Sequence, residues 1–314
     1  MEHKLIVTAA PHVTSSVTTG KIMGNVCVAL LPTLLVSTIV FGIRALLLTA
    51  VTVCACVVFE YAWCRVMKHD VTVADLSAVV TGLLLAFNLP PALPFWMAIV
   101  GAFIAIVLVK QLFGGLGYNF ANPAIVGRIA LALGFTGAMT TYTYPVSGID
   151  AFTAATPLAV DGNAGSYITL LLGNHGGVLG ETCAITLLLG GIYLIVTKTI
   201  SPMIPVSYLG TVAVLSLLLG RDPTYQLLSG GLILGAFFMA TDYVTSPTTD
   251  KGKLIFGIGL GLITCMIRFF GNMREGVSFA ILLMNLVVPY IDVLTRQAKL
   301  GIAQTKKGKE GKKA

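Results

Sequence analysis

The sequence has few charged residues and no long polar stretch between its apolar runs. Asp, Glu, Lys and Arg together make up 11% of the 314 residues, whereas 56% are apolar. A water-soluble core cannot bury so large an apolar fraction, so the composition excludes an ordinary soluble enzyme and indicates an integral membrane protein. The apolar runs suit helices that span a lipid bilayer, which need about 20 such residues each.

Several motifs of cofactor chemistry are also absent. The sequence has no G-x-x-x-x-G-K-[ST] nucleotide loop and no C-x-x-C pair, so we predict no metal site within the chain. We interpret the cysteines as apolar filling, with the alternative that one or two complete an iron–sulfur cluster shared with a neighbouring subunit. These cysteines are Cys27, Cys54, Cys56, Cys64, Cys183 and Cys265.

The positive charge does not indicate nucleic-acid binding. The net charge of +7 comes largely from a basic C-terminal tail that suits anionic lipid or a partner protein. This tail contains Lys306, Lys307, Lys309, Lys312 and Lys313.

The apolar runs predict about ten transmembrane helices, all of them α-helical. If the N-terminus is cytoplasmic, 16 of the 20 Lys and Arg residues fall on the cytoplasmic side, as short loops of membrane proteins require. We therefore expect a multi-pass membrane protein with both termini in the cytoplasm. The predicted spans are residues 26–43, 45–63, 73–87, 93–109, 123–139, 178–197, 204–219, 227–241, 254–269 and 277–294.

A weak internal repeat divides these helices into two halves. Residues 82–87 (GLLLAF) resemble residues 231–237 (GLILGAF), and LFG at 112–114 resembles FFG at 269–271. Five helices per half predict an inverted repeat, unless the similarity between apolar segments arose by chance. The predicted divisions are a cytoplasmic segment 1–25, a first repeat 26–139, an external loop 140–177, a second repeat 178–295 and a basic cytoplasmic tail 296–314.

The third helix of each half gives way to an interruption, at residues 88–94 and 240–250. Non-helical backbone at membrane depth must line a cavity or be covered by protein, so these interruptions predict a central site. Asp242 lies at the second one, where a carboxylate is costly unless it is paired, solvated or bound to a ligand. Asn119 and Asn122 lie in a Gly-rich segment that suits either a small-ligand site or a plain re-entrant connection.

Other ionisable residues lie near predicted helix ends. We interpret the acidic ones as reaching the lipid headgroups and the isolated histidines as solvated at the interface. Arg128 is predicted near the membrane and needs a partner there. The acidic residues are Glu60, Glu181, Glu275 and Asp292, and the histidines are His12, His69 and His175.

The external loop contains D150-A-F-T-A-A-T-P-L158, which offers hydroxyls but no base to activate them. From these residues alone, it is either a plain exported turn or an acceptor for covalent modification. The stretch resembles the D-x-x-S-G-A-T-P-L flavinylation motif of the D subunit of the ion-translocating ferredoxin:NAD oxidoreductase (Rnf) complex, and of the related B subunit of sodium-translocating NADH:quinone reductase. Residues 11–23, 29–32, 117–124 and 238–242 are also similar to landmarks of that family.

The resemblance implies that Thr156 carries FMN through a phosphoester bond made by a flavin transferase. Asp150, Ala155, Pro157 and Leu158 match the rest of the motif. Two positions depart from it: Thr153 stands where the family usually has Ser, and Ala154 where it usually has Gly. Both side chains remain small.

The family also implies a second, noncovalent flavin, riboflavin, with Asn122 and Asp242 as candidate contacts. It implies further membrane and peripheral subunits as partners, including a second flavin-bearing subunit and iron–sulfur subunits. It also implies that the membrane is the inner membrane of a prokaryote. The chain would not be catalytic alone.

The expected function is that of a flavin-carrying subunit of a pump that couples electron flow from reduced ferredoxin to NAD with Na⁺ or H⁺ export. A short segment before the first helix favours the ferredoxin complex over the quinone reductase, which is the near alternative. A channel or secondary transporter without redox chemistry is the alternative from another class, since an inverted repeat alone would suit it.

Overall fold

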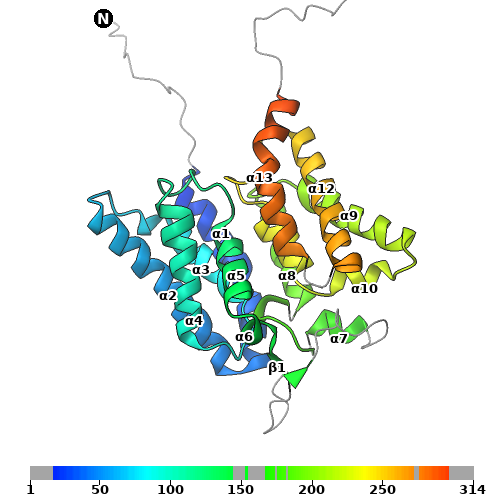
Figure 1. Ribbon diagram of the computed structural model, residues 1–314, viewed down its shortest axis with the longest axis horizontal. Helices are drawn as coiled ribbons and strands as arrows, with labels where there is room; N and C mark the ends of the chain where they lie inside the picture. The colour runs from blue at the N-terminus through cyan, green and yellow to red at the C-terminus, as the bar shows by residue number, and fades with distance from the viewer. Residues whose placement is uncertain are drawn as a thin grey trace, which may run out of the picture.

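The computed structural model describes residues 17–143, 153–154, 167–173, 175–181, 183–271 and 276–296. This part of the chain is almost entirely helical (Figure 1), so the prediction of an all-α membrane protein is confirmed. The exception is one antiparallel pair of two-residue strands, β1 (Tyr142–Thr143) and β2 (Thr153–Ala154). Tyr142 lies opposite Ala154, and Thr143 lies opposite Thr153.

The first half of the chain forms helices whose boundaries follow its Gly and Pro residues. Gly42 alone joins the first two helices, and its φ of 77° is a conformation that favours glycine. The third helix ends at Phe87, just before a Pro-rich segment that cannot continue it. The elements are α1 (Thr19–Phe41), α2 (Ile43–Val66), the 3₁₀ turn η1 (Val73–Asp75), α3 (Ser77–Phe87), α4 (Phe95–Phe103), the π-helical segment η2 (Ile104–Gln111), α5 (Pro123–Gly134) and α6 (Thr136–Thr140).

The second half contains a second π-helical segment and two long helices at its end. Its elements are α7 (Tyr167–Leu172), the 3₁₀ turn η4 (Leu179–Glu181), α8 (Ala184–Val196), α9 (Met203–Leu218), α10 (Pro223–Leu228), α11 (Leu232–Leu234), the π-helical segment η5 (Gly235–Met239), α12 (Asp250–Phe270) and α13 (Val277–Thr295). Figure 1 shows α1 beginning and α13 ending at the same face of the molecule, whereas β1 lies at the opposite face.

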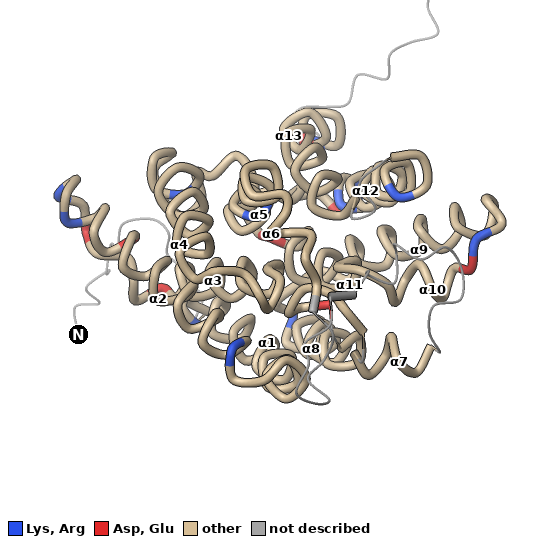
Figure 2. Tube along the Cα trace, turned by 60° about the horizontal axis from the view of Figure 1, so that its bottom comes forward, with Lys and Arg blue, Asp and Glu red and all other residues tan. Residues whose placement is uncertain are grey.

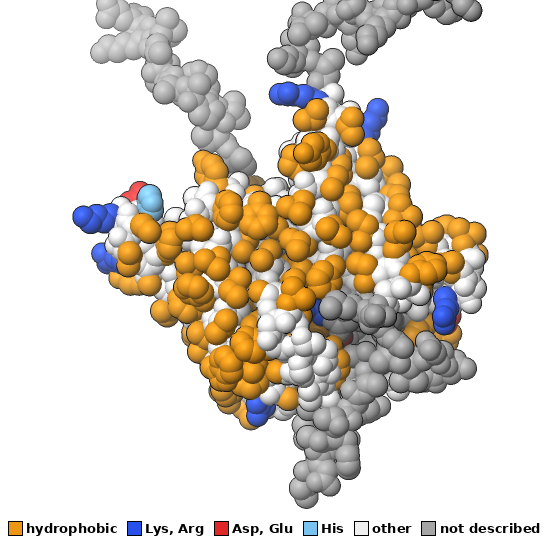
Figure 3. Space-filling view, in the orientation of Figure 1, with side chains coloured by type: hydrophobic (Ala, Val, Ile, Leu, Met, Phe, Trp, Pro, Cys, Tyr) orange, Lys and Arg blue, Asp and Glu red, His pale blue; other side chains and the backbone are white. Residues whose placement is uncertain are grey.

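The surface has the character expected in lipid. Hydrophobic side chains cover most of the described surface in view in Figure 3, and Lys and Arg lie near its edges. Among the described helices, α1, α2, α12 and α13 are each long and apolar enough to cross a membrane alone. The other predicted spans contain shorter helices, and hydropathy located these spans without resolving the breaks that several of them contain.

Four predicted spans are interrupted. The fifth span, residues 123–139, breaks at Phe135 between α5 and α6. The third breaks at Leu76, whose φ is 62°, and the eighth breaks at Gly230, whose φ is 70°. The sixth begins with η4, and the α-helix starts only at Ala184. The residues around these breaks are mostly small or apolar, so hydropathy alone does not distinguish the breaks from the helices on either side. The interruptions predicted after α3 and after η5 are present.

The two halves meet along α1 and α8, which run in opposite directions. Asn25, near the start of α1, donates to the Thr199 hydroxyl at 3.3 Å, just after the end of α8. Thr33, further along α1, bonds to Thr186 near the start of α8 at 3.2 Å. The first α-helices of the two predicted repeats are thus antiparallel, which is the relation that an inverted repeat requires.

Packing predicts one sensitive position at this interface. A Cβ on Gly190 would lie 2.4 Å from the carbonyl oxygen of Ala29, so Gly190→Ala forces α1 and α8 apart. We expect a loss of about 1–3 kcal/mol of stability, measured as a lower unfolding temperature in detergent. Gly210→Ala is the matched control, because a Cβ there meets nothing within 4 Å. Equal unfolding temperatures for the two variants would contradict this packing.

Candidate functional site

A pocket opens at the face of the molecule where α1 begins. Its walls come from the first turns of α1, α3 and α5, from the end of α8, and from both π-helical segments with the loops that follow them. It encloses about 730 Å³, part of which is open to solvent. π-helical turns often mark functional sites, and here two of them, from different halves of the chain, border one cavity.

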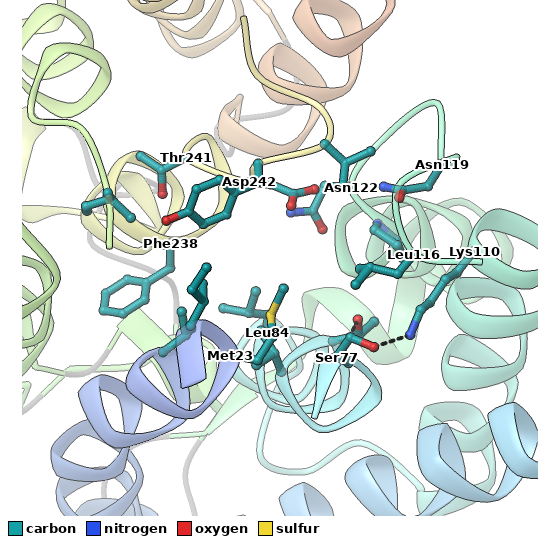
Figure 4. A pocket seen from close by; sticks show the side chains of 18 of the residues that line it. Met23, Ser77, Leu84, Lys110, Leu116, Asn119, Asn122, Phe238, Thr241 and Asp242 are labelled. Atoms are coloured by element: carbon teal, nitrogen blue, oxygen red, sulfur yellow. Dashed lines mark hydrogen bonds between the residues drawn. The ribbon is translucent and has the colours of Figure 1, made fainter. Parts of the chain in front are cut away.

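The pocket combines apolar walls with a small set of polar groups. Met23, Leu84 and Phe238 are among the apolar residues (Figure 4). The polar side chains are Ser77, Thr81, Lys110, Asn119, Asn122, Thr241, Asp242 and Tyr243. An apolar cavity with a few convergent hydrogen-bonding groups is the usual form of a small-molecule site.

Asn122 joins the two halves of the chain at this pocket. Its Oδ1 atom caps α5 by accepting from the backbone N–H of Ala124 at 3.1 Å and of Ile125 at 3.4 Å. Its Nδ2 atom donates to the carbonyl oxygen of Met239, at the end of η5, at 3.3 Å. Asn122 lines the cavity, and it also fixes the position of η5 against α5.

Asp242 lies just after η5, in the connection that leads to α12. The Thr245 hydroxyl donates to its Oδ2 atom at 3.1 Å. The structure thus brings Asp242 and Asn122, which are 120 positions apart in the sequence, to one pocket.

A buried ion pair lies at the wall of the pocket, and it corrects the sequence interpretation of Glu60. The Lys110 ammonium lies 2.6 Å from the Glu60 carboxylate, and both side chains are almost fully buried. Glu60 was expected to reach the headgroups from near a helix end. The structure instead extends α2 to Val66 and η2 to Gln111, which places both residues inside the bundle.

Arg128 and Glu181 are also buried. Arg128 donates to the Asn88 side chain at 3.0 Å and to the Ser278 hydroxyl at 2.7 Å, which supplies the partners predicted for it. The headgroup interpretation of Glu181 is wrong, because η4 places this side chain beside Gly231 at the start of α11, where it is 4% exposed.

The remaining interfacial interpretations have mixed outcomes. His175 is 6% exposed, so solvation at the interface is wrong for it. Asp292 is only half-buried and lies near the end of α13, as predicted. Glu275 and His12 lie outside the described residues. All six cysteines are free thiols, and Cys56, Cys64, Cys183 and Cys265 are buried.

Comparison with known proteins decides the family. The model of the "NQR2, RnfD, RnfE family" matches residues 6–301. The chain belongs to this family.

Individual relatives are similar over nearly their whole length. The chain is 47% identical to the D subunit of the Na⁺-translocating ferredoxin:NAD⁺ oxidoreductase complex of Acetobacterium woodii, over 98% of each chain. It is 43% identical to the D subunit of the proton-translocating ferredoxin:NAD⁺ oxidoreductase complex of Clostridium ljungdahlii, over 94% of this chain and 96% of that one. It is 37% identical to the D subunit of the ion-translocating oxidoreductase complex of Stutzerimonas stutzeri, over 90% and 92%.

The motif that carries the family resemblance lies mostly beyond the described residues. Thr153 and Ala154 form β2, which pairs with β1. Asp150, Ala155, Thr156, Pro157 and Leu158 lie outside the described part. Since β1 lies at the face opposite the start of α1 (Figure 1), β2 and the pocket are on opposite faces of this family member.

Proposed function

We propose that the chain is the flavin-carrying membrane subunit of a redox-driven pump. The pump couples electron transfer from reduced ferredoxin to NAD with export of Na⁺ or H⁺. The observation that carries the proposal is 47% identity, across 98% of both chains, to a subunit named for that reaction. The match between residues 150–158 and the flavinylation motif supports covalent FMN on Thr156.

The pocket suits a flavin that lacks a phosphate, such as riboflavin. Phe237, Phe238 and Leu84 provide apolar surface for a planar ring, and Asn122 and Asp242 provide hydrogen-bonding groups for its edge. Lys110 is the one cation among the residues that line the described pocket, and Glu60 neutralises it. With Asp242 nearby, the pocket offers no net positive charge to hold a phosphate.

The covalent FMN on Thr156 and the noncovalent flavin in the pocket would carry electrons at two separate sites of the protein. A bound flavin can accept one or two electrons, so it can link iron–sulfur centres to two-electron carriers. The chain's own residues would position the ring and exclude water from it. The partners that this role needs are other membrane and peripheral subunits, including a second flavin-bearing subunit and iron–sulfur subunits, and a flavin transferase for maturation.

The test is reconstitution of the purified complex into liposomes. Reduced ferredoxin and NAD are supplied on the accessible side, and NADH formation is followed together with ²²Na⁺ uptake and internal pH. We expect one of the two cations to accumulate only while electrons flow. NADH formation at the same rate with neither cation moving, in sealed liposomes without ionophore, would contradict the proposed coupling.

The orientation is a separate prediction. α1 begins and α13 ends on one face of the molecule (Figure 1). In the predicted topology most Lys and Arg residues lie on the side of the termini, and short loops rich in these residues stay in the cytoplasm, so this face is expected to be cytoplasmic. We expect a reporter fused after Ala314 to be active in the cytoplasm, and one inserted at Asp161 to be active outside. The reverse pair of signals would overturn the orientation.

A further inference from the structure

The ion pair of Lys110 and Glu60 is the centre of a buried polar network at the wall of the pocket. The Lys110 ammonium donates to Glu60 Oε2 and to the Ser77 hydroxyl, each at 2.6 Å. The Thr72 hydroxyl donates to Glu60 Oε1 at 2.7 Å. The Ser77 hydroxyl in turn donates to Asp75 Oδ1 at 2.5 Å. Three of these four bonds join residues that are 12 or more positions apart in the chain, so the network fixes the ammonium in one place.

Few charged residues lie inside the bundle, which makes this pair unusual. The charged residues visible in Figure 2 gather mostly at helix ends, for example at the end of α2 and at the turn between α9 and α10. A buried ion pair is weak as a source of stability, because both ions lose their hydration. Its position therefore suggests a role beyond holding α2 against η2.

The two charges are not equivalent with respect to the pocket. Lys110 and Ser77 line the cavity, whereas Glu60 lies behind them and does not. Figure 4 shows the Lys110 side chain reaching Ser77 at the edge of the pocket. A ligand in the pocket therefore meets the ammonium before the carboxylate, although the pair as a whole is neutral. Burial makes this difference effective, because the screening by water is weak there.

We propose that the Lys110 ammonium raises the reduction potential of a flavin ring in this pocket, and that the Glu60 carboxylate limits this increase. The proposal rests on the proposed function, since it requires a noncovalent flavin at this site. A flavin ring held there would gain one negative charge if it took up one electron without a proton. The ammonium favours that charge, and the carboxylate opposes it.

The test is a redox titration of the noncovalent flavin in the purified complex. Lys110→Met removes the positive charge and should lower the potential, whereas Glu60→Gln removes the negative charge and should raise it. We expect each change to alter the ratio of reduced to oxidised flavin at least tenfold, which is about 59 mV for a one-electron couple. Lys253→Met is the matched control, because Lys253 pairs only with the exposed Asp250 at 3.4 Å.

The opposite signs separate this role from a structural one. Damage to the fold by an unpaired buried charge would move both potentials in the same direction or release the flavin from both variants. The double variant Lys110→Met with Glu60→Gln leaves no lone charge, and it should keep the flavin at a potential between those of the single variants. Shifts of the same sign, or unchanged potentials with the flavin still bound, would overturn the proposal. Absence of extractable flavin from the wild-type protein would instead overturn the flavin pocket itself.

Discussion

Thr156→Val should abolish covalent flavin on this chain and, with it, electron transfer from ferredoxin to NAD through the complex. Valine has nearly the shape of threonine but no hydroxyl, so the substitution removes the oxygen that would form the phosphoester bond and little else. The helices should insert normally, since residue 156 lies in the predicted external loop 140–177. The measurement is in-gel flavin fluorescence of the denatured chain, together with ferredoxin-dependent NADH formation.

Thr153→Val is the matched control for this prediction. Thr153 belongs to the same motif and carries the other hydroxyl, but it stands three residues before the acceptor position. Its substitution can weaken recognition by the flavin transferase, but it should not move the bond. Full fluorescence in Thr156→Val, or its disappearance only in Thr153→Val, would show that the acceptor has been assigned to the wrong residue.

Asp242→Asn should release the noncovalent flavin from the pocket while the covalent flavin on Thr156 stays in place. Asparagine keeps the size of the side chain and can still accept the hydrogen bond from Thr245, so the loop should hold its shape. What is lost is one negatively charged hydrogen-bond acceptor. Hydrogen bonds to charged groups contribute about 1.5–3 kcal/mol, so we expect at least tenfold weaker binding of riboflavin. The measurement is the flavin extracted from the denatured complex, separated by chromatography.

Asp250→Asn serves as the control for Asp242. Asp250 is also a carboxylate near the same loop, but it is exposed and does not line the pocket. It should leave extractable flavin, covalent flavin and turnover unchanged. If Asp242→Asn also leaves all of these unchanged, Asp242 does no more than shape the connection between η5 and α12.

The sequence predicted where the helices lie better than where they break. Apolar runs located the long helices to within several residues, because a bilayer imposes a minimum length on every span. The breaks at Leu76 and Gly230 left only a weak signal, because Asp75 with Ser77 and Ser229 with Gly231 are short interruptions within otherwise apolar runs. A buried 3₁₀ turn such as η4 is stabilised by contacts with α3 and α11, which the local sequence does not encode.

The candidate site shows the same limit. Asn122 and Asp242 were predicted separately, from a Gly-rich segment and from an interruption, and the fold brings both to one pocket. The Lys110–Glu60 pair was missed because its members are 50 positions apart and each lies close to the end of an apolar run. Residues of this kind look like topological markers until the neighbouring helices are placed. A hint was available in the small polar residues Thr72 and Ser77 between them, which now bond to the pair.

The proposed FMN on Thr156 can be detected by peptide mass spectrometry of the chain from the native complex. Proteolysis should yield a peptide that spans residues 144–166 and carries the mass of FMN less one water, with fragmentation placing the adduct on Thr156. The unmodified peptide should predominate only when the flavin transferase is absent. An adduct on Thr153, or no adduct on any peptide from this loop in the active complex, would contradict the assignment of FMN to Thr156.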